Sequence, residues 1–152
     1  MTADVQHCTL VFERILKVPS ARVFEAYADP AQRARWGVAS DTAVLIYDIA
    51  DFRAGGIDRF RCGSRANPNI QGMATYLSIV PEHRIVWSEI IEMDGHGLGA
   101  SLNTVVLESE GGGTRLISTV QAASFVGAEM IKGFETGTAA ALDNLVHHCN
   151  AA

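Results

Sequence analysis

The last part of the chain, from about Val126 to Cys149, has the pattern of one long amphipathic helix. Glu129, Lys132 and His147 fall on one side of it when successive residues are turned by about 100°. The other side carries a stripe of apolar or small residues at positions 126, 130, 131, 134, 137, 138, 141, 142 and 145. A stripe of this length must be buried against a large partner, and a concave sheet is the only such partner this chain offers.

Most of the preceding chain consists of β-rich runs separated by turn signals such as Gly55-Gly56 and Asp94-Gly95. The strands predicted from these runs are Thr9–Val18, Thr42–Ile49, Ile57–Cys62, Ile70–Val80, Arg84–Glu92, Leu98–Glu108 and Thr114–Ala123. Connections this short join only antiparallel neighbours, because a parallel crossover needs about a dozen residues or more. The prediction is therefore an α+β fold with a seven-stranded curved antiparallel sheet.

Two short helices are predicted between the first and second strands. Residues 21–28 form the first, with Ser20 as its N-cap. The second has Asp29 as N-cap, Pro30 at its first position and Gln32 placed to close a capping box, and it ends by Trp36.

Length and charge limit the classes of function. A chain of 152 residues with 48% hydrophobic residues fits one domain, 1–152. A formal net charge of −5 disfavours nucleic acid and anionic membranes, although Arg53, Arg59, Arg61 and Arg65 form a local basic stretch. No apolar run approaches the ~20 residues that membrane insertion requires. Three cysteines without a CxxC spacing, and no N-terminal apolar signal, indicate a reduced cytoplasm.

Three glycines, Gly127, Gly133 and Gly137, fall within the predicted terminal helix. Each costs roughly 1 kcal/mol of helix stability relative to alanine, so something should compensate. One interpretation is close packing of the helix on the sheet. The other is space for a ligand beneath Met130, Phe134 and Ala141, and the sequence leaves both open.

The strand Arg84–Glu92 places Trp87 and Glu89 on the same face, because side chains alternate along a strand. If this face is concave, Glu89 points into a pocket under the helix, where desolvation would raise its pKa and make it a candidate acid or base. If it is convex, Glu89 is an ordinary surface carboxylate. Asp48, Asp51 and Asp58 lie in or beside neighbouring strands, but their spacing assigns no catalytic pair.

No metal or cofactor is expected. In His147-His148-Cys149 adjacent helical side chains point about 100° apart, whereas metal ligands on a helix are three or four residues apart. Nucleophile-elbow, phosphate-loop and zinc-protease motifs are absent from the sequence, and Cys62 is interpreted as a small buried hydrophobe. No catalytic residue is assigned.

Aromatic side chains are the strongest candidates for contact with an apolar ligand. Ordinary core packing explains any one of them equally well. Together with one carboxylate and one methionine, the predicted ligand-binding residues are Trp36, Phe60, Tyr76, Trp87, Glu89, Met130 and Phe134.

Short motifs and single residues along the sequence resemble those of a known family. They are Arg14, Val18-Pro19, Val23-Phe24, Ala26, Asp29-Pro30, Trp36-Gly37, Asp51, Gly55-Gly56, Gly72, Ile79-Val80-Pro81, Arg84-Ile85-Val86, Gly113-Thr114-Arg115-Leu116 and Leu142 with Leu145. In this order they resemble the AHSA1-like family, homologues of the activator of the Hsp90 ATPase, within the START and Bet v 1 (SRPBCC) superfamily. The resemblance implies the helix-grip fold, in which the sheet wraps around the terminal helix.

What this resemblance implies about function is broader. The leading expectation is a small hydrophobic molecule bound between the terminal helix and the sheet. An enzyme of polyketide cyclase or hydrolase type acting on an apolar substrate is the alternative. An Hsp90-associated module is least favoured, because the eukaryotic activator depends on an additional N-terminal domain that this sequence lacks. A homodimer is left open.

Overall fold

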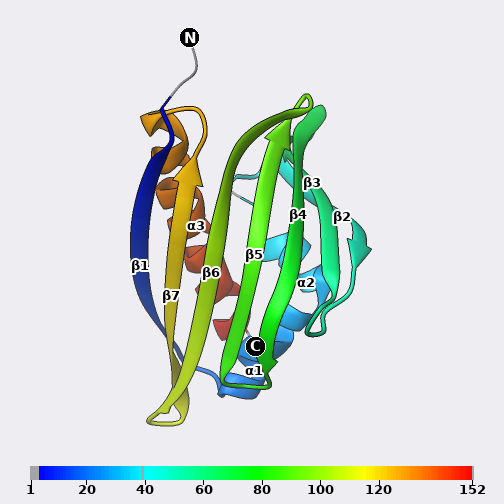
Figure 1. The fold of residues 1–152 in the computed structure, drawn as a ribbon. Helices are drawn as coiled ribbons and strands as arrows, with labels where there is room; N and C mark the ends of the chain where they lie inside the picture. The colour runs from blue at the N-terminus through cyan, green and yellow to red at the C-terminus, as the bar shows by residue number, and fades with distance from the viewer. Residues whose placement is uncertain (1–3, 39, 152) are drawn as a thin grey trace.

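Seven antiparallel strands form one curved sheet that wraps around a long helix, as Figure 1 shows for the computed structural model. The structure describes residues 4–38 and 40–151. The strands are β1 (Gln6–Leu16), β2 (Ala43–Ala50), β3 (Ile57–Ser64), β4 (Asn67–Val80), β5 (Arg84–Met93), β6 (His96–Glu110) and β7 (Gly113–Ser124). Their spatial order is β1-β7-β6-β5-β4-β3-β2, so β1 and β2 form the two edges.

Three helices lie on the concave side of this sheet. They are α1 (Ser20–Ala28), α2 (Pro30–Trp36) and α3 (Ala128–Asn150). In Figure 1 helix α3 runs from behind β1 and β7 to behind β6, α1 lies at the lower end of the sheet, and α2 lies behind its β2, β3 and β4 side. The α+β helix-grip fold and its order of elements are therefore as predicted, with α1 and α2 carrying the chain from one sheet edge to the other.

The ends of the short helices differ from the prediction in two details. Ser20 is the first residue of α1 and not its side-chain cap, because its hydroxyl lies 3.1 Å from the Thr114 hydroxyl. Asp29 caps α2 as predicted, accepting a hydrogen bond from Ala31 N at 2.9 Å. Gln32 does not close a capping box, since its amide donates to the carboxylates of Asp29 and Glu25.

Helix α3 begins one residue after Gly127, which corrects the prediction that this glycine is inside the helix. Gly127 precedes the first turn with a φ of 88°, in the left-handed region that favours glycine. Its carbonyl accepts a hydrogen bond from the Ser124 hydroxyl at 2.6 Å. Gly127 therefore makes the turn from β7 into α3, whereas Gly133 and Gly137 are helical.

The buried apolar side chains form two separate clusters of unequal size. The larger cluster joins α1, α2 and the C-terminal half of α3 to the sheet, and includes Leu16, Tyr27, Ile85, Leu116 and Leu145. The smaller one consists of Val120, Ala122 and Phe134, with Cys8, Leu10, Ile91 and Met130 packed against it. Helix α3 therefore contacts the sheet at both ends through different clusters.

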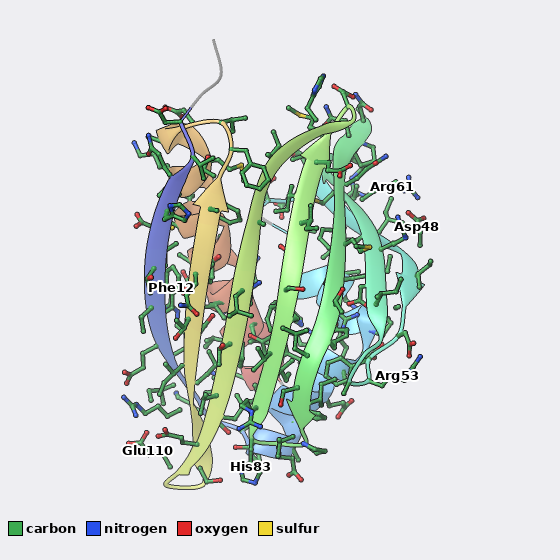
Figure 2. All side chains as sticks on the ribbon, viewed as in Figure 1. Phe12, Asp48, Arg53, Arg61, His83 and Glu110 are labelled. Atoms are coloured by element: carbon green, nitrogen blue, oxygen red, sulfur yellow. The ribbon has the colours of Figure 1, made fainter. Side chains whose placement is uncertain are left out.

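The basic stretch lies on β3 and on the connections at its two ends. Arg61 Nε lies 2.8 Å from Asp48 Oδ2, and Figure 2 shows both residues at that edge of the sheet. Arg53 Nε lies 2.9 Å from Asp51 Oδ2 in the connection between the two strands. Two of the four arginines are thus paired with acidic residues. Within residues 4–38 and 40–151, no helix has both the length and the apolar character needed to span a bilayer.

Candidate functional site

A cavity of about 500 Å³ lies between the concave face of the sheet and helices α2 and α3. Residues of both core clusters line it, including Tyr76 and Leu142 from the larger cluster and Val120 and Phe134 from the smaller. The cavity therefore lies where the core is divided. Its wall is mainly apolar and aromatic, and its charged side chains are Arg33, Asp58 and Glu89.

All seven residues that the sequence predicted for ligand contact line this one cavity: Trp36, Phe60, Tyr76, Trp87, Glu89, Met130 and Phe134. They come from α2, from the adjacent strands β3, β4 and β5, and from the first two turns of α3. Contact with a ligand stays a prediction. The structure brings the seven residues together around one cavity, and Trp36, Tyr76 and Phe134 also belong to the buried core clusters.

Strand β5 turns its Trp87 face toward the helix, so the first of the two alternatives for Glu89 holds. Ile85, Trp87, Glu89 and Ile91 alternate along the strand and all line the cavity. On the neighbouring strands Glu89 pairs with Ala74 of β4 and Ser101 of β6. Both neighbours are small, so the carboxyl group is not covered by a large side chain from either adjacent strand.

Burial raises the pKa of Glu89 to about 7; the Trp87 side chain beside it acts to lower this pKa, and the negative charge of Asp58 acts to raise it. Glu89 keeps part of its surface accessible, and that surface lies in the cavity. Near neutral pH the group is thus divided between the acid and the carboxylate. This is the property of a general acid or base, and also of an acidic binding group.

A buried ion pair connects α2 to β3 at the side of the cavity. Nη2 of Arg33 lies 3.2 Å from Oδ2 of Asp58, and the two side chains are only 8% and 3% exposed. Nη2 is not aligned for a hydrogen bond to any residue of the described chain. Nε of Arg33 donates to the Tyr47 hydroxyl at 3.2 Å, and Nη1 donates to the Tyr76 hydroxyl at 3.1 Å and to the Tyr27 carbonyl.

Tyr76 closes this network because its hydroxyl donates to Asp58 Oδ2 at 2.5 Å. Burial raises the pKa of Tyr76 above its usual range, against the opposing effect of Arg33. Burial also raises the pKa of Tyr47 to about 12. Both phenols are therefore neutral at physiological pH, and the guanidinium of Arg33 lies 4.6 Å from the centre of the Tyr47 ring.

The two helical glycines of α3 face the cavity. A β-carbon added at Gly137 would meet no atom within 4 Å, and one added at Gly133 would meet only the end of Met130 at 3.7 Å. Close packing of the helix on the sheet therefore does not explain them. The alternative, space beneath the helix, agrees with the geometry at both positions.

Arg33, Tyr47 and Asp58 line the cavity but were not among the predicted site residues. Side chains alternate along a strand, so Asp58 falls on the same face of β3 as Phe60 and Cys62. Its place at the site could therefore have been predicted from the sequence. Arg33 lies three residues before Trp36 on α2, hence on the same side of that helix. The pairing of Arg33 with Asp58 could not be predicted from the sequence, because it depends on how α2 packs against the sheet.

Cys62 and the terminal histidines carry no evident chemistry. Burial and the nearby Glu89 raise the pKa of the Cys62 thiol to about 11, so it is a neutral thiol at pH 7. His148 Nε2 lies 2.8 Å from Gln32 Oε1, while His147 is exposed. In the part of the chain that the structure describes, no three His, Cys, Asp or Glu residues are grouped as metal ligands.

Known proteins share both sequence and fold with this chain. A family model described as activator of Hsp90 ATPase homolog 1-like protein matches residues 17–150. No curated protein matches the chain. A solved structure from Rhizobium loti is 38% identical, with a TM-score of 0.84 over 96% of this chain and 99% of that one. A second, an uncharacterized protein from Rhizobium leguminosarum, is 32% identical, with a TM-score of 0.85 over 98% of each chain.

A more distant solved structure shares the fold. The AHSA1-like protein from Aeromonas hydrophila is 21% identical, with a TM-score of 0.72 over 95% of this chain and 93% of that one. At this identity the likeness concerns the architecture alone.

Proposed function

The chain belongs to the activator of Hsp90 ATPase homolog 1-like family, and from this we propose that it binds a small hydrophobic molecule between α3 and the sheet. The observation that carries the proposal is the cavity of about 500 Å³ with its mainly apolar wall. Binding sites for small molecules typically measure roughly 300–1,000 Å³ and combine apolar walls with a few polar groups. Arg33, Asp58 and Glu89 are such polar groups here.

The cost of a cavity that side chains do not fill supports this function. Engineered cavities destabilise a protein by roughly 24 cal/mol per Å³, so even about 100 Å³ of unfilled space costs roughly 2 kcal/mol. Gly133 and Gly137 add roughly 1 kcal/mol each in lost helix propensity. A larger side chain at Gly137, which is half-buried, would extend into the cavity, and alanine at either position would strengthen the helix. The presence of glycine at Gly137 is consistent with space used by a ligand.

A cavity-filling variant tests the proposal. We expect Gly137→Leu to fold and to lose uptake of a naphthylmethanol probe by about tenfold or more, because the new side chain occupies the cavity. Thr136→Leu is the matched control, since Thr136 is the neighbouring residue of α3 and is exposed. Titration calorimetry gives the affinities, and native mass spectrometry of the purified protein reports any ligand already bound. Equal uptake by all three proteins would contradict the proposal.

The position of Glu89 favours a second candidate function, enzymatic proton transfer on an apolar substrate. A carboxylate surrounded by apolar side chains is a stronger base than one in water. Nitrobenzisoxazole reports this reactivity, because removal of its ring proton breaks the N–O bond and releases a coloured cyanophenolate. We expect the rate of ring opening to rise with pH, with a midpoint near the Glu89 pKa of about 7. The Glu89→Gln variant should lose this activity. A rate no greater than that of Glu89→Gln would remove this candidate.

A further inference from the structure

Glu89 is the charged group of the cavity wall that lacks a counterion. Arg33 is already paired with Asp58 at 3.2 Å and lies in a network with Tyr47 and Tyr76. Among residues 4–38 and 40–151 no arginine, lysine or histidine forms an ion pair with Glu89. The side chain next to it on the same face of β5 is Trp87, which is neutral.

The charges around the cavity do not balance when Glu89 is ionised. One guanidinium, that of Arg33, faces two carboxylates, those of Asp58 and Glu89. The other titratable groups near Glu89 are the Tyr47 phenol and the Cys62 thiol, and burial keeps both neutral by raising each pKa. An ionised Glu89 therefore leaves one uncompensated negative charge in a mainly apolar space. Such a charge takes up either a proton or a cation.

The surroundings of Glu89 suit an organic cation better than a hydrated metal ion. The aromatic rings of Phe60 and Trp87 line the same cavity as Glu89, and aromatic faces attract ammonium groups. Small neighbours on β4 and β6 leave room for a head group beside the carboxylate. Ile91, Met130 and Phe134 offer an apolar surface for the rest of the molecule.

We propose that the cavity selects hydrophobic amines, with the ligand ammonium group paired to the Glu89 carboxylate and its apolar body between α3 and the sheet. This inference rests on the proposed ligand-binding function and adds the chemical class of the ligand. A ligand carboxylate would meet two like charges in the wall, whereas a neutral alcohol would gain a hydrogen bond without compensating the charge.

Three probes with one apolar body and different head groups test the selectivity: naphthylmethylamine, naphthylmethanol and naphthoate. At pH 8 we expect the full-length protein to bind the amine about tenfold more tightly than the alcohol, and the carboxylate most weakly. Glu89→Gln should lower amine affinity to about that of the alcohol and change alcohol affinity far less than amine affinity. Glu92→Gln, an exposed position on the opposite face of β5, should change none of the three.

Amine affinity should also fall as the pH is lowered through about 7, because Glu89 then takes up a proton while the ligand remains an ammonium ion. Alcohol affinity should not follow this change.

The outcomes separate the two proposals. If naphthoate or naphthylmethanol binds with the same affinity as the amine, the proposed selectivity for amines is wrong, but the proposed ligand-binding function is supported. If none of the probes binds, the ligand-binding function fails and the inference fails with it. The comparison of the three probes uses the unaltered protein, so the result does not depend on the folding of a variant.

Discussion

The ring of Phe60 covers Gly72 so closely that a β-carbon on Gly72 would lie 2.1 Å from Phe60 Cζ. The two residues are partners across β3 and β4, and the Phe60 ring lines the cavity. The glycine on β4 therefore fixes the position of an aromatic side chain on β3. One wall of the cavity depends on a residue that has no side chain.

Gly72→Ala should displace the Phe60 ring, because the added methyl group and the ring cannot occupy the same space. We expect a loss of about 1–3 kcal/mol in the free energy of unfolding and a changed affinity for apolar probes. Urea denaturation and probe titration measure the two effects. In a Phe60→Ala background the same substitution should cost much less, and an equal cost in both backgrounds would contradict the steric explanation.

Gly137→Ala should stabilise the protein by up to about 1 kcal/mol. Alanine is the better helix former, and its methyl group would enter open space at this position. Thermal denaturation should show a higher midpoint. At Gly127, where φ is 88°, the same change should destabilise the protein, because an alanine side chain is strained there. A gain in stability from the alanine substitution at Gly127, or a loss at Gly137, would contradict the described backbone conformation of that glycine.

Glu89→Gln should stabilise the protein at pH 8 and have little effect at pH 4. The folded-state pKa of Glu89, about 7, is above its ordinary value of 4.5. Burying its ionised form lowers stability as the pH rises between these values, and a neutral glutamine avoids that loss. We expect a gain of roughly 2–3 kcal/mol at pH 8 from chemical denaturation across the pH range. The exposed control Glu92→Gln should change the free energy of unfolding by the same amount at pH 4 and at pH 8. The same pH-independent change in Glu89→Gln would contradict a raised pKa for Glu89.

Removal of one member of the Arg33–Asp58 pair should be strongly destabilising. Arg33→Met leaves the Asp58 carboxylate buried without its counterion, which typically costs about 3–5 kcal/mol. The double variant Arg33→Met/Asp58→Asn should lose less than the sum of the single variants, as a double-mutant cycle in urea would measure. Arg61→Met removes an exposed pair with Asp48 and should matter little. Additive losses at Arg33 and Asp58 would show that the two residues are not coupled.

The strands and helices could be predicted from the sequence because their signals are local. Alternating apolar residues between glycine turns identified all seven strands, and the spacing of apolar residues identified α3. Boundaries were less accurate: the first strand is Gln6–Leu16 and not Thr9–Val18, although its pairing with β7 is regular. Strand β4 begins at Asn67 and not at Ile70, and Pro68 is tolerated there because the pairing with β3 shifts between Cys62 and Ser64.

The candidate site could be predicted only in part. Alternation put Trp87 and Glu89 on one face of β5, but which face is concave depends on the curvature of the whole sheet. The buried pair joins residues 33 and 58, which belong to different elements, and no periodic signal connects them. Local pattern thus found side chains that line the cavity, whereas their mutual contacts required the folded structure.

Because the core is divided unequally, the two halves of α3 are attached to the rest of the protein by different numbers of contacts. Near its C-terminus, Asp143 bonds to Arg14, Asn144 Nδ2 to the Val38 carbonyl at 2.7 Å, and Leu145 is buried in the larger cluster. The first turns pack mainly through Phe134 in the smaller cluster, next to the cavity. Local opening should therefore begin there, with amides 131–137 exchanging with deuterium before amides 142–149. Such opening would give a molecule a way into the interior while the rest of the fold stays intact.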